Sequence, residues 1–447
     1  MRTPVVLPER LCAEVNRMKV RIIALLLFVA ATPSLSLAQI KCTNTSTNLA
    51  CLAAVTVAPT GYTTTNGAIQ GQNTDTGQPV NLIGIPFLNS DIGGEISQIP
   101  LASPASGIIF TIDPTLHVPV PSDQSLGPIL TQRAETIGRH KFYIAVTYQY
   151  FLLRDADGHG LKSLPTLYGL SSTGTDTPDA IALANSRVDL KVHQFVGYAT
   201  FGLTSRIDLS LAVPVLRVDE RYTSNEQLFP LTPAGLLAGT PTTFQNSQAR
   251  EATGIGDIVA AMKATLIKKR HAGFAVGAEV RLPTGDSANY LGSGTYGVKP
   301  FAAFTYSAKI SPHFNVGYQA NGSTVLVVDN NNHQGNLPNR LYYSGGADWK
   351  LGSHFTVAAD VIAQRVFDSP RAVVATNVGF QSQNGFTFLP SVLIASTGTY
   401  NRTDASLGFK WKPFGNLLIT GNTIVKLDQG GLRARYVPLF GASYTFH

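Results

Sequence analysis

The last residues of the chain alternate in a pattern that few folds can accommodate. Tyr436, Phe440, Tyr444 and Phe446 fall on one face of an extended strand, and the other face carries mostly small or polar residues. In a soluble protein such a strand would leave an open edge that can pair with another chain. In a closed barrel the last strand pairs with the first, and its aromatic side chains lie at a membrane interface. The pattern therefore favours a transmembrane β-barrel.

The segment before His447 resembles the assembly signal at the C-terminus of bacterial outer-membrane proteins. It reads Gly-Ala-Ser-Tyr-Thr-Phe, and Gly441, Tyr444 and Phe446 are the candidate signal residues. His447 is a departure, because Phe usually ends such chains. The resemblance implies the barrel-assembly machinery as a partner and the bacterial outer membrane as the location.

Composition agrees with many strands and argues against nucleic-acid binding. Only 14% of the 447 residues are charged, while 41 Gly, 22 Phe and 16 Tyr suit aromatic strands joined by glycine-rich turns. The formal net charge is +7, but the basic residues are dispersed and form no basic run with interleaved aromatics. We therefore expect no nucleic-acid partner.

The N-terminus carries the pattern of an export signal. Three basic residues precede the apolar run 22–31, and residues 36–38 have the small-x-small form of a cleavage site. The apolar run is about half of the roughly 20 residues that a spanning helix needs. We predict a signal peptide over residues 1–38, with Met18 as an alternative start.

Two cysteines, Cys42 and Cys51, follow the predicted signal. Exported proteins meet an oxidising compartment, so we predict a disulfide between them. Two unpaired thiols in a disordered segment are the alternative.

Residues 39–140 lack a long periodic segment and are rich in Thr, Gly, Ser, Asn and Pro. Two interpretations stay open for this stretch. It is either a flexible periplasmic leader or a segment folded into the barrel as a partial plug.

From Lys141 onward the hydrophobic pattern has period two, which is the primary signal of strands. Twelve strands are predicted, at 141–153, 187–201, 206–218, 254–267, 272–283, 297–308, 313–323, 340–350, 355–366, 402–412, 417–426 and 433–446. Short and long connections alternate between them, as in barrels with short periplasmic turns and long external loops. The predicted fold is all-β, an antiparallel up-and-down transmembrane barrel of about twelve strands over residues 141–447. A soluble β-sandwich would also alternate, but the aromatic ends of the apolar faces and the export signal favour the membrane.

Charged residues gather on one face wherever the phase of a strand is clear. In the strand at 206–218, for example, Ile207, Leu209 and Leu211 alternate with charged or small residues. A one-residue slip would place bases in hydrocarbon at about 2–4 kcal/mol each near the midplane. We therefore assign the charged face to the lumen, whose candidate lining residues are Arg187, Lys191, Arg206, Asp208, Asp257, Lys263, Glu279, Arg281, Lys299, Arg340, Asp348, Asp360, Arg402, Asp404, Lys410 and Arg435.

Bases outnumber acids in this set, which predicts a mildly cationic interior that favours anions. Cross-strand charge pairs that stabilise the barrel are the alternative role for any one of these residues. Twelve strands lie between filled small barrels and wide porins, so we expect a narrow or partly blocked passage.

Four short motifs resemble those of one family. They are Gly-Ile-Gly-Asp at 254–257, Arg-Leu-Pro-Thr-Gly-Asp at 281–286, Leu-Gly-Ser-Gly at 291–294 and Asn-Val-Gly-Tyr at 315–318. The family is the outer-membrane proteins called putative MetA-pathway of phenol degradation, and the resemblance covers about 187–447. It implies a barrel that moves small, often aromatic or hydrophobic, compounds. Read physically, Pro283 ends a strand and the following residues supply a turn, so the motif is explained without a ligand, and a direct role in substrate binding is the alternative.

Other motifs carry no chemistry. The G-x-G-x-x-G match at 292–297 has no helix after it, so it lacks the geometry that cradles phosphate. Asp155 and Asp157 begin a stretch like a calcium loop, but its closing position holds Thr166 instead of Glu. The nine His lack metal spacing, and no His-Ser-acid set falls on a lipid-facing strand. We expect no metal, no cofactor and no enzymatic activity.

These patterns predict an outer-membrane channel or transporter for small, aromatic, hydrophobic or weakly acidic compounds. Outer-membrane lipid and a small-molecule substrate are the implied partners. The alternative is a plugged structural barrel whose long external loops, near 219–253 and 367–401, bind another partner.

Overall fold

The structure is a computed structural model in which Gln39–His447 form one compact unit. The described residues are 40, 42, 45–59, 61–65, 69–73, 79–82, 92–99, 110–112, 119–121, 126–175, 177–269, 271–328, 334–375, 378–382, 385–389 and 391–446. The predicted signal peptide, the alternative start at Met18 and the departure at His447 lie outside the described residues.

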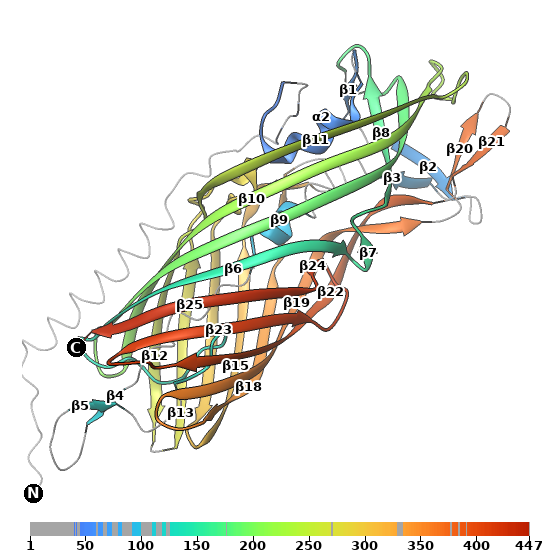
Figure 1. The fold of residues 1–447 in the computed structure, drawn as a ribbon. Coiled ribbons are helices and arrows are strands. Elements are labelled where there is room, and N and C mark those ends of the chain that lie inside the picture. The colour runs from blue at the N-terminus through green and yellow to red at the C-terminus, as the bar shows by residue number, and fades with distance from the viewer. Residues whose placement is uncertain are drawn as a thin grey trace, which may run out of the picture. The chain divides into compact units, whose positions relative to one another are not determined.

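Twelve strands of the described chain close into a barrel (Figure 1). Each pairs antiparallel with the next, and the last, β25 (Tyr436–Phe446), pairs with the first, β6 (Phe142–Ala156), through register partners that include Phe446 and Phe142. The other ten are β9 (Ala180–Gly202), β10 (Ile207–Pro230), β12 (Val259–Lys268), β13 (Ala272–Arg281), β14 (Gly297–Tyr306), β15 (Ile310–Asn321), β18 (Arg340–Lys350), β19 (Phe355–Ala375), β22 (Val392–Trp411) and β23 (Leu417–Lys426). The predicted fold class is confirmed.

Smaller elements lie in the N-terminal segment and in the long connections. The helical ones are η1 (Leu49–Cys51), α2 (Leu52–Val57) and η2 (Ser287–Asn289). The strands are β1 (Thr63–Thr64), β2 (Ile69–Asn73), β3 (Pro79–Leu82), β4 (Phe110–Ile112), β5 (Pro119–Pro121), β7 (His159–Gly160), β8 (Leu164–Ser171), β11 (Thr242–Ile255), β16 (Ser323–Val328), β17 (Gln334–Asn336), β20 (Val378–Ser382), β21 (Gly385–Leu389) and β24 (Leu432–Ala434). In the part of the chain that is described, no helix combines the length and the apolar character needed to cross a bilayer.

Short and long connections alternate around the barrel, as the sequence predicts. The short ones lie at 203–206, 269–271, 307–309, 351–354 and 412–416. β6 begins and β25 ends at the same end of the barrel as these turns. Because short turns of bacterial barrels are periplasmic, this is the periplasmic end, and the long connections are external.

Several strands continue beyond their predicted external ends. β9 begins at Ala180, and β10 continues to Pro230. Most of β11 lies within the predicted external loop 219–253, and this strand pairs with the outer part of β10. β19 and β22 extend into the predicted loop 367–401. The hydrophobic pattern missed these extensions because strands outside the bilayer meet water on their outward face and need no apolar alternation there.

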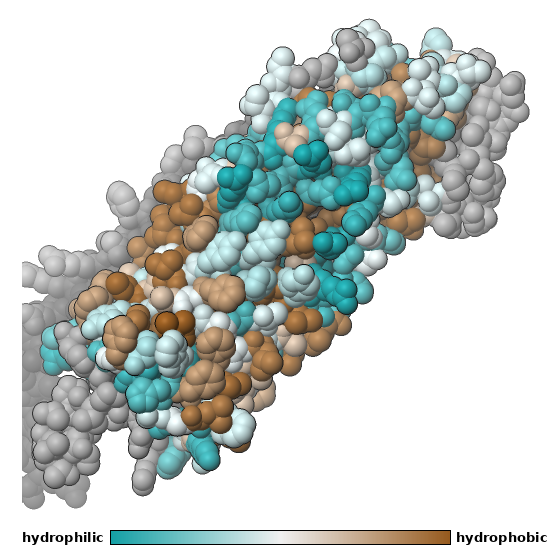
Figure 2. All heavy atoms as spheres, viewed as in Figure 1, coloured by the Kyte–Doolittle hydropathy of each residue, from teal (hydrophilic) through white to brown (hydrophobic). Residues whose placement is uncertain are grey.

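A band of exposed apolar side chains surrounds the part of the barrel nearer the periplasmic turns. It includes Phe142, Phe195, Leu209, Leu211, Val276, Phe304, Phe314, Val316, Trp349, Leu407, Trp411, Phe440 and Phe446. Figure 2 shows hydrophobic residues gathered towards that end of the visible face and hydrophilic residues over the external part of β9 and β10. Exposed apolar area of this extent is stable only against lipid. The protein is therefore a β-barrel of the bacterial outer membrane.

Described parts of the N-terminal segment pack against the inner face of this barrel. Towards the external end, Leu49 and Leu52 share a buried cluster with Val218 and Tyr222 of β10. Nearer the periplasmic end, Ile137 packs in a second cluster with residues of β6 and β9. Residues 49–57, 92–96 and 126–138 therefore contribute to the buried interior of the barrel. This is the arrangement expected of a partial plug rather than of a flexible leader.

Candidate functional site

Most of the predicted lumen-lining residues lie on the inner face of the barrel. They are Asp208, Asp257, Lys263, Glu279, Arg281, Lys299, Arg340, Asp348, Asp360, Arg402, Asp404 and Lys410. Nearly all are buried, which charged side chains tolerate only when other groups satisfy them. The partners of these residues therefore define what the interior can do.

The assignment of Arg187 and Lys191 to the lumen is wrong. Both are exposed on the outward face of β9, while Val188, Leu190 and Val192 are buried on its inward face. This part of β9 stands outside the bilayer, so its outward face meets water and its inward face packs in the cluster that contains α2. The prediction failed because it treated every outward face as lipid-facing.

Arg206 and Arg435 also lie outside the lumen. Arg206 is exposed in the turn before β10, and Arg435 is exposed between β24 and β25. A register shift in the pairing of β24 with β6 moves the alternation by one, so Arg433 is the buried residue and its Nη2 atom lies 2.8 Å from Asp404 Oδ1. An irregularity of this kind cannot be recognised from alternation alone.

Two inward lysines hold the segment 126–138, which we call the inner segment. Lys263 Nζ donates to the carbonyl oxygens of Arg133, at 3.0 Å, and Glu135, at 2.8 Å. Lys410 Nζ donates in the same way to Leu126, at 3.2 Å, and Pro128, at 2.7 Å. An extended segment has backbone groups that need partners when water is excluded. These lysines supply donors that a regular strand ladder would otherwise provide.

Neutral and acidic wall residues complete this pairing of the inner segment. Asp208 Oδ2 accepts a hydrogen bond from Ile137 N at 3.1 Å. Thr265 Oγ1 donates to Ala134 O at 2.6 Å, and Thr305 Oγ1 accepts from Ala134 N at 3.0 Å. The inner segment is therefore bound side by side with the barrel wall, through β10, β12 and β14.

Beside the inner segment, a histidine joins two of the predicted acids. His313 is fully buried, with Nε2 at 2.6 Å from Asp360 Oδ1 and Nδ1 at 3.2 Å from Asp348 Oδ1. The histidines are scattered along the sequence without metal spacing, and only the inward phase of β15 could have indicated this one. Within the described residues, no group of three or more His, Cys, Asp or Glu is arranged to hold a metal ion.

Glu95 connects the N-terminal segment to two arginines on the inner face of the barrel, Arg340 and Arg402. It lies on a helical turn at 92–96 and is 4% exposed. Its Oε1 atom accepts from Arg340 Nη2 at 2.7 Å and from the Tyr400 hydroxyl at 2.6 Å, and its Oε2 atom accepts from Arg402 Nη1 at 3.0 Å. Glu95 is not among the predicted site residues, although charged residues are rare in the stretch that contains it.

A cavity of about 220 Å³ lies between this helical turn, the inner segment and the wall. One part of its lining is apolar, with Ile96, Ile99, Leu130, Tyr198, Leu216 and Ile362. Another part is polar, with Glu279, Arg281, Lys299, Gln319 and Gln364. Lys299 Nζ lies 2.6 Å from Glu279 Oε2 and 4.9 Å from the centre of the Tyr342 ring, so these opposite charges largely cancel. The cavity therefore offers an apolar pocket with polar groups that carry little net charge.

Three of the four family-like motifs, at 254–257, 281–286 and 291–294, meet around Asp257, beside this cavity. Its carboxylate accepts hydrogen bonds from Gly285 N at 3.1 Å, from Ser293 N at 2.8 Å and from the Ser293 hydroxyl. Arg281 Nε lies 3.7 Å away. A Cβ at Gly292 would stand 2.5 Å from Asp257 Oδ1, so only glycine fits there. The motif residues thus fold the connection between β13 and β14 back against the wall.

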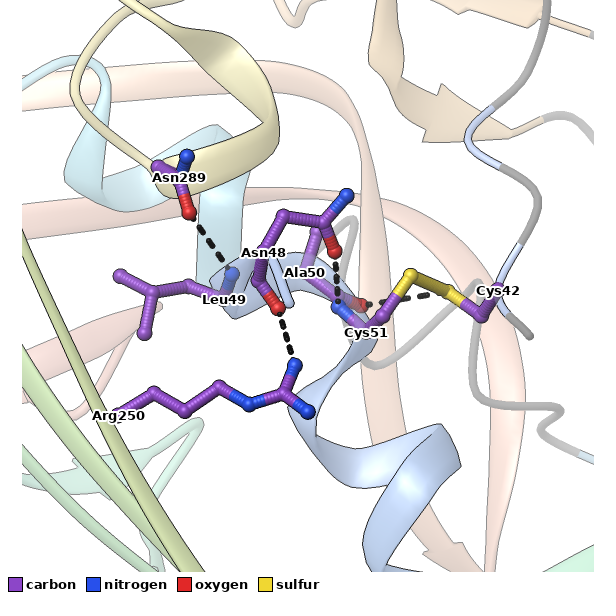
Figure 3. The surroundings of a disulfide bond; sticks show 7 residues. All are labelled: Cys42, Asn48, Leu49, Ala50, Cys51, Arg250 and Asn289. Atoms are coloured by element: carbon purple, nitrogen blue, oxygen red, sulfur yellow. Dashed lines mark hydrogen bonds between the residues drawn. A yellow bond between two sulfur atoms is a disulfide. The ribbon is translucent and has the colours of Figure 1, made fainter. Parts of the chain in front are cut away.

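The predicted disulfide between Cys42 and Cys51 is present, with an S–S distance of 2.03 Å. It lies directly before α2 (Figure 3). Asn48 Oδ1 accepts from Cys51 N at 3.1 Å and caps η1. The disulfide and the cap together define the start of the described helical segment.

This helical segment bridges β11 and η2. Arg250 Nη1 of β11 donates to Asn48 O at 2.9 Å, and Leu49 N donates to Asn289 Oδ1 of η2 at 3.0 Å (Figure 3). β11 pairs with β10 along its length. The N-terminal segment therefore contacts both β11 and the connection that contains η2.

Sequence comparison finds one family that matches the part of the chain that contains the motifs. Residues 175–388 match the family described as Putative MetA-pathway of phenol degradation. This stretch is therefore similar in sequence to that family. The match begins slightly earlier than the expected 187–447 and ends before the last strands. Among curated proteins, none is significantly similar to the chain in sequence.

Comparison with solved structures finds outer-membrane proteins at low identity. A COG4313 outer membrane channel from Pseudomonas putida F1 is 13% identical, with a TM-score of 0.42, over 71% of this chain and 99% of that one. The CymD monoaromatic hydrocarbon channel is 9% identical, with a TM-score of 0.34, over 69% and 89%. A Pseudomonas aeruginosa FadL homologue is 10% identical, with a TM-score of 0.32, over 76% and 96%.

Proposed function

We propose that the protein is an outer-membrane channel for small molecules with a ring-sized apolar body and one polar substituent. The cavity inside the barrel is the observation that carries this proposal. Its volume of about 220 Å³ exceeds that of an engineered cavity of about 150 Å³ known to hold benzene. A substituted aromatic ring therefore fits.

The lining of the cavity supports this class of substrate. Binding pockets for small molecules combine apolar walls with a few polar groups that fix orientation. Here Leu216 and Ile362 offer apolar contact, while Gln319 and Gln364 offer amide groups that can both donate and accept. The similarity of residues 175–388 to the phenol-degradation family supports such a substrate.

Passage towards the periplasm requires the inner segment to move or to leave a narrow path. Its backbone is held by one or two hydrogen bonds from each of several separate side chains, such as those of Thr265 and Lys410. Each such bond contributes about 1 kcal/mol net, more where the donor is charged. We propose transport through this interior, rather than catalysis, as the role of the charged wall residues.

A pair of adjacent alanines allows a matched test. Ala261 lines the cavity, and Ala260 is its neighbour on the opposite face of β12. Ala261→Phe should fill the cavity, whereas Ala260→Phe adds the same ring to the lipid-facing side. In proteoliposomes we expect uptake of phenol or benzyl alcohol faster than in protein-free liposomes through the wild type and Ala260→Phe, and a loss of most of this excess in Ala261→Phe. Equal uptake by all three proteins, or none by the wild type, would refute the proposal.

A further inference from the structure

The three groups around Glu95 have the geometry of a carboxylate-binding site. Arg340 and Arg402 each donate to a different carboxylate oxygen, and Tyr400 adds a hydroxyl donor. Both arginines are buried, at 0% and 7% exposure. Arginine is over-represented where proteins recognise a carboxylate, because its guanidinium group forms strong charge-assisted hydrogen bonds. Here the carboxylate is supplied by the chain itself.

The wall depends on Glu95 for its charge balance at this point. Apart from Glu95, Arg340 donates to the neutral Gln364 Oε1 atom at 3.1 Å and to Gly94 O at 3.5 Å. Arg402 Nε lies 3.6 Å from Asp404 Oδ2, but Asp404 is also paired with Arg433. A buried guanidinium without an anion is costly. If the helical turn 92–96 moved away, the site would require another anion.

The cavity lies next to this site. Gln364 accepts a hydrogen bond from Arg340 and also lines the cavity. Ile96 and Gln98, on the segment that carries Glu95, line the cavity too. A molecule whose ring occupies the cavity therefore has its substituent within reach of the arginines once Glu95 withdraws. A planar ring with a carboxylate matches both parts, since the cavity takes the ring and the arginines take the charge.

We propose that Arg340, Arg402 and Tyr400 form a binding site for arenecarboxylates, and that Glu95 occupies it as an internal competitor. This inference rests on the proposed channel function and adds a substrate class and a site to it. A tethered carboxylate competes at an effective concentration in the millimolar range. Glu95 therefore weakens the apparent binding of a free carboxylate, and entry of the ligand and release of the helical turn are coupled.

The first test compares benzoate with its neutral analogue benzyl alcohol. Both are titrated calorimetrically into the purified, full-length protein in detergent, with heat-modifiable gel mobility as the check that each variant is folded. Glu95→Gln removes the charge and keeps the shape, so we expect benzoate to bind about tenfold more tightly and benzyl alcohol to bind as before. Adding Arg340→Gln to this variant should abolish the gain. Glu251→Gln, on the exposed outer face, is the matched control and should change neither affinity.

A second test uses the wild type alone, so it does not depend on the folding of a variant. Benzoate at saturating concentration should increase hydrogen exchange of residues 92–99, because it displaces Glu95, and benzyl alcohol should not. Unchanged exchange with bound benzoate, or a gain in Glu95→Gln that survives Arg340→Gln, would overturn the inference. In that event, uptake of benzyl alcohol that Ala261→Phe blocks would still uphold the channel. If neither compound binds or crosses, the proposed function itself fails.

Discussion

Replacing Asp257 with alanine tests whether the family motif has a structural role. Asp257 is 6% exposed and holds the connection between β13 and β14 through Gly285 N and Ser293 N. The Ser293 hydroxyl also donates to Thr295 O at 2.9 Å, so it keeps an acceptor without Asp257. Arg281 keeps the neutral Asn321 Oδ1, at 2.7 Å, but loses the carboxylate 3.7 Å away, which adds to the cost. The substitution therefore leaves two backbone N–H groups without their acceptor.

The expected cost follows from these two groups. A buried donor that loses its partner costs about 1–3 kcal/mol, so Asp257→Ala should destabilise the folded connection by about 2–6 kcal/mol. Since 1.4 kcal/mol corresponds to a tenfold change in an equilibrium constant, local opening should increase at least about 30-fold. Leu291 lines the cavity, so opening of this connection should also widen the passage.

Hydrogen exchange of residues 284–296 is the direct assay, and conductance in planar bilayers is the functional one. Asp286→Ala is the matched control, because Asp286 caps η2 through Ala288 N at 3.0 Å but is exposed. We expect the control to cost about 1 kcal/mol. If exchange in Asp257→Ala rises no more than in Asp286→Ala, the motif does not act as an anchor and our reasoning about it is wrong.

Three further outcomes are expected. Burial raises the pKa of Glu220 to about 8 against the opposing charge of Arg250, in a part of β10 outside the bilayer, so the neutral carboxyl favours the folded state. This stabilisation is complete below about pH 4.5 and is lost as pH rises towards 8. Amide hydrogen exchange of α2, corrected for intrinsic rates, should therefore increase between pH 6 and 9 in the wild type. It should not increase in this way in Glu220→Gln. Leu211→Arg, on the lipid-facing side of β10, should cost about 2–4 kcal/mol in thermal unfolding, whereas Asn225→Arg, outside the bilayer, should cost almost nothing. Cys42→Ser opens a loop whose ends are 9 residues apart and should destabilise η1 by about 2.5 kcal/mol without lowering the barrel's unfolding temperature.

The strand that contains Arg187 explains why some residues were wrongly assigned to the lumen. Alternation states which residues share a face, but it does not state what that face meets. In β9 near Phe195 the outward face meets lipid, and near Lys191 the same face meets water. The two environments reverse the meaning of a charge, so a rule that holds inside the bilayer fails a few residues beyond it.

Glu95 shows a different limit. Its segment has no period that would place it, and its partners Arg340 and Arg402 are more than 240 residues away along the chain. The arginines themselves were assigned correctly to the inner face, because lipid excludes charge from the other one. What they bind depends on which segment enters the barrel, and no local pattern encodes that.

The sequence by itself determined the barrel, its twelve strands and the membrane that surrounds it. These follow from local rules, since every residue of a spanning strand must satisfy lipid on one side and the lumen on the other. The disulfide also followed from local reasoning, because Cys42 and Cys51 are close in the chain. Only the tertiary structure decided which residues fill the barrel, how Asp257 gathers the motifs and which anion the inner arginines bind. These contacts join segments that are distant in the chain. Their free energies depend on positions in space that the local sequence does not determine.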